Sequence, residues 1–296
     1  MRTVYAARSS KGTKHVNTVR AVAHPTFAVA EFFRNSDSDK MRARWLGLGL
    51  KDVTPLWSTE RHVHTFSTDA DVPKWPTFQE QLSDVEADWY YVSGHHGRQF
   101  MSDFNVVTDD PVVHGNTQAE VGFFNERYHQ GRWKHNTHDN PGLPQPNEVY
   151  VSTSDKPAGA PLGPVDNPLY LNGRPDCKGM ILMGCNTLAY KTVRNALMNA
   201  FAKAVIIGFV GQTPLGDEAV EPIRTVLGRS FFIEPPTDTD KLKKLVLDLN
   251  TAYRRVLPGT MAVQQGSSLY KCNKQVTDVR VHPAGGDLTR DDYRHA

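Results

Sequence analysis

The chain has 296 residues, of which 39% are hydrophobic, and its 34 basic and 32 acidic side chains leave a formal net charge of only +2. This length and composition fit one large α/β domain or two small ones with an ordinary core. The near-neutral charge balance gives no reason to expect nucleic acid or a membrane surface as a partner. Because residues 1–20 lack the apolar run of a secretory signal and no stretch is long enough to span a membrane, we expect a cytoplasmic protein.

The first third of the chain mixes a polar arm with short apolar runs. Residues 1–18 show no apolar period, so we predict a basic, solvated arm, with partner binding as the alternative. One of the runs 19–23 and 28–33 is predicted to be the first core strand. The patterns that follow predict a short helix, a strand and a second helix, at 41–50, 61–67 and 75–88.

The segment 89–97 reads Trp-Tyr-Tyr-Val-Ser-Gly-His-His-Gly, an aromatic and β-branched run that ends in glycine and histidine. We predict a buried strand here. From about 101 to 178 the periodicity weakens, and we predict an insertion of hairpins and loops with strand-like pieces at 121–124 and 148–153. The three histidines of this stretch lack partners at zinc spacing, so no metal is predicted; they are His129, His135 and His138.

The segment 179–187 reads Gly-Met-Ile-Leu-Met-Gly-Cys-Asn-Thr, an apolar strand that ends at Cys185. A helix over 188–201, a strand over 204–210 and a helix over 238–257 are predicted to follow it. This alternation predicts an α/β fold with a parallel sheet that is covered on both faces. The three cysteines, Cys177, Cys185 and Cys272, are too few for a disulfide framework, so at least one thiol is expected to be free.

The predicted strands in 89–97 and 179–187 end in residue types that can act in catalysis, histidine and cysteine. If they are neighbouring parallel strands, their carboxyl ends lie at one sheet edge, and the histidine and Cys185 meet there as base and nucleophile. We expect Cys185 at the start of a helix, whose dipole favours the thiolate, and small Gly97 and Gly184 to leave room for a substrate backbone. The amides of Gly97 and Cys185 would hold an oxyanion. Either motif alone is more typical of a buried structural thiol or a simple strand end, whereas the two together favour a catalytic pair.

The blocks 92–97, 180–187 and 204–212 together resemble the caspase-like cysteine peptidases, and Leu-Met-Gly-Cys-Asn-Thr at 182–187 is closest to the bacterial CHAT domains. Those proteins share an apolar block that ends in His-Gly and a later one that ends in a small residue and cysteine. The resemblance implies a three-layer α/β/α fold with a mostly parallel sheet. It also implies Cys185 as nucleophile, His96, rather than His95, as base because a glycine follows it, and Gly97 as oxyanion donor.

The function that this resemblance implies is a cysteine endopeptidase with a Cys-His dyad, acting on a protein or peptide without metal or organic cofactor. By analogy it would work in bacterial defence or regulated cell death, switched on by an activating protein partner. The peptidase domain would cover 19–257, with 258–296 as a C-terminal extension. Two alternatives stay open, a non-cleaving caspase-like regulatory or interaction module and a cysteine hydrolase that acts on a small amide.

Overall fold

The computed structural model describes residues 24–31, 36–54, 85–98, 121–124, 150–152, 176–213, 217–253, 261–273, 276–289 and 292. The predicted arm 1–18, the strand predicted at 61–67 and the three insertion histidines lie outside these residues. Of the helix predicted at 75–88, only residues 85–88 are described, and they form a loop instead.

Eight strands form the main sheet, in the order β11-β10-β9-β8-β7-β3-β1-β2. Five neighbouring strands, β2, β1, β3, β7 and β8, run parallel to one another, whereas β9, β10 and β11 alternate in direction. Their bounds are β1 Thr26–Glu31, β2 Lys51–Asp52, β3 Trp89–Ser93, β7 Gly179–Met183, β8 Val205–Phe209, β9 Met261–Gln265, β10 Ser268–Cys272 and β11 Val279–Pro283. The segment after 258, predicted as an extension, therefore supplies strands to the main sheet.

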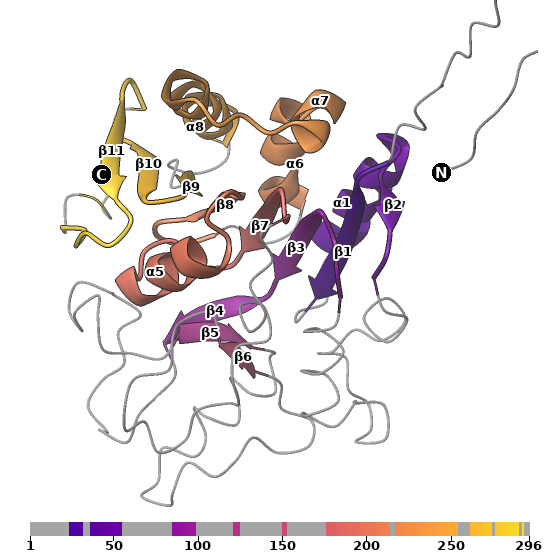
Figure 1. Ribbon diagram of the computed structural model, residues 1–296, viewed down its shortest axis with the longest axis horizontal. Helices are drawn as coiled ribbons and strands as arrows, with labels where there is room; N and C mark the ends of the chain where they lie inside the picture. Colours follow the sequence, from indigo (N-terminus) through magenta and orange to yellow (C-terminus); the bar gives the residue numbers. More distant parts are fainter. Residues whose placement is uncertain are drawn as a thin grey trace, which may run out of the picture.

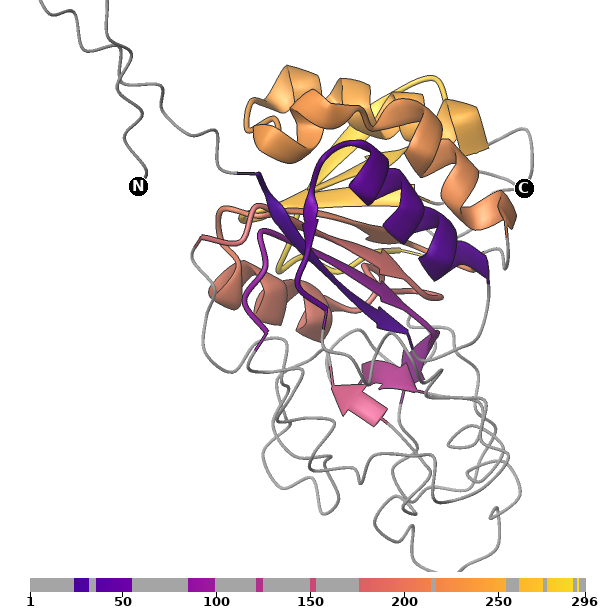
Figure 2. The same cartoon turned by 90° about the vertical axis from the view of Figure 1, so that its right-hand side faces the viewer.

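Helices cover both faces of this sheet, as Figures 1 and 2 show. One face packs against α1 (Ser36–Gly47), α6 (Asp217–Val226), α7 (Arg229–Ile233) and α8 (Thr239–Tyr253), and the other against α5 (Lys191–Ala200). Alternate residues of each strand supply the two cores, since Tyr90 packs on the α5 side and Tyr91 on the opposite side. The predicted α/β fold, with a mostly parallel sheet inside a three-layer arrangement, is therefore present.

A second, three-stranded sheet begins directly beyond β3. After a bend at Gly94 the chain continues as β4 (His95–Arg98), which pairs antiparallel with β5 (Val121–Phe124), and β5 pairs with β6 (Tyr150–Ser152). Figure 1 shows this small sheet beside the main one. The insertion predicted at 101–178 thus supplies β5 and β6, close to the predicted strand-like pieces. The histidine motif is not a strand end but the beginning of this second sheet.

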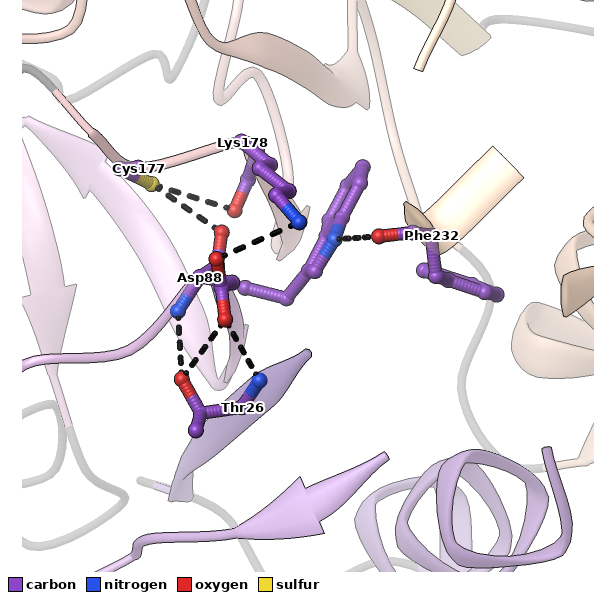
Figure 3. Close-up of polar contacts among 7 residues, drawn as sticks. Thr26, Asp88, Cys177, Lys178 and Phe232 are labelled. Carbon is purple, nitrogen blue, oxygen red and sulfur yellow. Dashed lines mark hydrogen bonds and ion pairs between the residues drawn. The ribbon is translucent and has the colours of Figure 1, made fainter. Parts of the chain in front are cut away.

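Polar contacts at the amino-terminal ends of the parallel strands fix their register (Figure 3). The Thr26 amide and hydroxyl donate to Asp88 Oδ2 at 2.7 and 3.0 Å, and the Asp88 amide donates back to Thr26 Oγ1 at 2.9 Å. The amides of Lys178 and Gly179 donate to the Asp88 carbonyl, and Lys178 Nζ lies 3.5 Å from Asp88 Oδ1. Asp88 therefore aligns the first residues of β1, β3 and β7. The register of these strands in turn determines which residues are neighbours at their carboxyl ends.

Candidate active site

The two sequence motifs come together at the carboxyl ends of β3 and β7. These strands are adjacent and parallel, and Ser93 pairs with Met183 as the last residue of each. His96 lies three residues beyond Ser93, and Cys185 lies two residues beyond Met183. There, Nδ1 of His96 is 2.8 Å from the carbonyl oxygen of Cys185. A carbonyl oxygen can only accept, so Nδ1 carries the proton and Nε2 is the unprotonated nitrogen of the neutral ring.

His96 is a buried, neutral imidazole. Only 4% of its surface is exposed, and its ring packs against Phe123 of β5 at a centroid distance of 4.8 Å and against Tyr190 at 6.2 Å. Burial lowers the pKa of His96 from 6.5 to about 4, although the hydrogen bond to the Cys185 carbonyl opposes the shift. At neutral pH the ring is therefore uncharged, with its proton on Nδ1.

Gly184 has a different role from the one expected. A β-carbon at this position would lie 2.6 Å from Cβ of His96 and 2.8 Å from Cε1 of Phe123. The space beside Gly184 is therefore filled by the histidine and the phenylalanine, so it is not room for a substrate. The missing side chain is what lets β4 and β5 pack directly on the strand that carries Cys185.

Cys185 differs from the other two cysteines of the chain. All three thiols are free, but Cys177 and Cys272 are buried, whereas Cys185 is half-buried. Burial raises the pKa of Cys272 to about 11. The Thr213 amide donates to Sγ of Cys185 at 3.5 Å, and such a donor favours the anionic form of a sulfur. Cys185 is thus the thiol with both solvent access and a backbone donor.

The loop after Cys185 is tied to the end of β8. Asn186 adopts a left-handed φ of 58°, its amide donates to the Gly211 carbonyl at 2.8 Å, and its Oδ1 accepts from the Gly211 amide at 3.0 Å. Thr187 Oγ1 accepts from the Phe209 amide at 2.9 Å and donates to the Leu182 carbonyl at 3.3 Å. These bonds form where the β7–β8 pairing stops, and they fix the backbone on both sides of Cys185.

The helix expected at Cys185 does not begin there. Residues 185–189 form turns, and α5 starts only at Lys191. The left-handed Asn186 interrupts any helical run from Cys185, so the prediction of a stabilising helix dipole at this thiol was wrong.

The other predicted participants are only partly described. Gly97 lies in β4 and pairs with Gly122, and its role as oxyanion donor stays a prediction. The side chain of His95 lies outside the described residues. Within the described part of the chain no group of three or more His, Cys, Asp or Glu side chains is placed to hold a metal ion. The same part contains no helix that is both long and apolar enough to cross a membrane.

A scan against protein-family models and searches of curated proteins and of solved structures found no match. The case for a function therefore depends on the site itself.

Three contributors to this site escaped sequence analysis. Phe123 buries the histidine, the Thr213 amide faces the sulfur, and the Tyr253 hydroxyl is buried without a hydrogen-bond partner among the described residues. Burial, followed by the charges of Cys185 and Glu218, raises the pKa of Tyr253. The strand-like pattern of 121–124 was the available signal for Phe123, whereas nothing local marks the other two.

Proposed function

We propose that this chain is a caspase-like cysteine endopeptidase, with Cys185 as nucleophile and His96 as its base. The observation that carries the proposal is the hydrogen bond from Nδ1 of His96 to the main-chain carbonyl of half-buried Cys185, just beyond two adjacent parallel strands. Such an edge is where open α/β folds keep their sites. The order of the two motifs along the chain and the glycine before the cysteine agree with the resemblance to caspase-like and CHAT proteins.

The reaction needs no group beyond these side chains and water. As Sγ of Cys185 attacks the scissile carbonyl carbon, its proton passes to Nε2 of His96, and a tetrahedral oxyanion forms. The amides of Gly97 and Cys185 are the proposed donors to that oxyanion. When the C–N bond breaks, the imidazolium returns the proton to the leaving amine, and water then hydrolyses the thioester to free acid and thiol.

One observation favours the second candidate, a caspase-like module that does not cleave. Because the pKa of His96 is lowered to about 4, protonating it costs roughly 3 kcal/mol more than protonating an ordinary histidine. This cost slows proton transfer from the thiol. It is also compatible with a peptidase that a protein partner activates by loosening the packing around His96.

The test combines cleavage with labelling. A peptide library is incubated with the wild-type protein, with Cys185→Ala, and with Cys272→Ala as the matched control that removes a buried thiol. We expect the first variant to lose at least about a thousandfold in cleavage rate and the control to keep it. A thiol-directed peptide warhead should label Cys185 and not Cys272. Cleavage that survives in Cys185→Ala would defeat the assignment, and an inert Cys185 without cleavage would favour the non-cleaving module.

A further inference from the structure

A fully buried arginine connects the cysteine loop to a distant part of the chain. Arg194 of α5 is 0% exposed, and its guanidinium donates to four main-chain carbonyl oxygens. Two of them, those of Leu188 at 2.9 Å and Ala189, belong to the loop that follows Cys185. The other two, those of Ala284 at 2.8 Å and Gly286, belong to the turn after β11.

This turn, residues 284–289, is packed onto α5 (Figure 1). Leu288 is 3% exposed and belongs to the same core cluster as Leu188. Nζ of Lys191, the first residue of α5, lies 3.4 Å from Asp287 Oδ1. The turn therefore packs against the start of α5 and is connected to the cysteine loop through Arg194.

A buried carboxylate anchors the chain just beyond the turn. Asp292 Oδ2 accepts hydrogen bonds from the Thr289 amide at 2.8 Å and the Thr289 hydroxyl at 2.9 Å. Its Oδ1 lies 3.9 Å from Nζ of Lys271 and 3.6 Å from Nε2 of His282. The Lys271 side chain is only 5% exposed, and a buried ammonium without a carboxylate is strongly disfavoured. Asp292 thus ties Thr289, at the end of the turn, to Lys271 of β10 and His282 of β11.

We propose that Arg194 is the positioning residue of the cysteine loop, and that docking of residues 284–289, which Asp292 holds through Thr289, controls the order of that loop and hence of Cys185. A planar guanidinium reaches both segments at once, which a single ammonium cannot do. The loop needs this support because residues 185–189 form turns and Asn186 is held at a left-handed φ of 58°. The relevance to catalysis rests on the proposed function, whereas the coupling between the two segments does not.

Hydrogen exchange followed by mass spectrometry tests the coupling in the full chain. Asp292→Asn keeps an acceptor for Thr289 but removes the charge that Lys271 faces. The matched control is Asp248→Asn, which removes a Lys–Asp pair on the exposed side of α8. We expect roughly tenfold faster exchange in peptides that cover 284–289 and also 185–190, with α8 unchanged. Faster exchange confined to 284–289, or spread evenly over α8 as well, would overturn the proposal.

A second variant addresses the arginine itself. Arg194→Lys should speed exchange at 185–190 by a similar factor while β3 and α8 stay protected, and unchanged exchange at 185–190 would contradict the positioning role. Should Arg194→Lys fail to fold, the Asp292→Asn result still decides. In a cleaving protein, kcat should fall about tenfold in Asp292→Asn with KM little changed, since the loop holds the nucleophile and not the substrate. If the wild type cleaves nothing, the proposed function fails while the exchange result stands.

Discussion

The buried His96 predicts a specific loss of stability in acid. Its pKa is about 4 in the folded protein and 6.5 in the unfolded reference, because burial disfavours the charged ring. Between these two values the unfolded state binds more protons than the folded one, so stability falls as the pH is lowered through this window. The difference between the two pKa values corresponds to roughly 3 kcal/mol once the ring is protonated in both states, and to roughly 2–3 kcal/mol at pH 4.5.

The assay is urea unfolding of the wild type and of His96→Gln at pH 7.5 and at about pH 4.5. Glutamine does not titrate, and its amide can donate to the Cys185 carbonyl in place of Nδ1. All other ionisable groups titrate alike in both proteins, so they cancel in the difference. We expect the wild type to lose roughly 2–3 kcal/mol more than the variant over this range. Equal losses, within about 0.5 kcal/mol, would refute the view that His96 is buried and neutral.

Three further predictions concern the same site. In a cleaving protein the acid limb of kcat/KM that belongs to His96 should lie near pH 4 and not near 6.5, which a pH–rate profile checks. Gly184→Ala should destabilise the protein by roughly 1–3 kcal/mol in thermal unfolding, since its Cβ would lie 2.6 Å from that of His96. The control Gly228→Ala, whose Cβ would have no atom within 4 Å, should destabilise it far less. Equal losses of stability in the two variants would contradict the packing around Gly184. Thr187→Val should cost about 1–3 kcal/mol in urea unfolding because it leaves the buried Phe209 amide unpaired, and a neutral result would argue against that bond.

The sheet strands that carry the site could be predicted because their signals are local. The apolar runs that became β3, β7 and β8 are bounded by polar or glycine residues within a few positions. The structure places β7 and β8 within a residue or two of the expected bounds, whereas β3 ends at Ser93, before the histidines. From parallel neighbours it also follows that residues just beyond β3 and β7 lie near each other, which the bond from His96 to the Cys185 carbonyl bears out.

The hairpin of β9 and β10 has a local sequence signal in its turn. Gln265 is followed by Gly266 and Ser267 before β10, which is a two-residue turn of the kind that joins antiparallel strands, and Gly266 adopts a φ of 54°. In contrast, α6 contains Pro222 in its interior and follows a proline and glycine pair, so its pattern is typical of a loop. A helix there depends on packing against the sheet, which local residue types do not encode.

The properties that decide what the site can do come from contacts between residues far apart in the sequence. His96 and Cys185 identify a dyad by type, yet the low basicity of the histidine is set by burial, to which Phe123 of β5 contributes. We likewise propose that Arg194 sets the position of the cysteine loop, since it donates hydrogen bonds to carbonyls about ninety residues further along the chain. Motifs can therefore name candidate residues, whereas the proton affinity of the histidine and the order of the cysteine loop depend on how the second sheet and residues 284–289 pack around them. Changing those contacts while keeping both motif residues should alter reactivity without altering the apparent dyad.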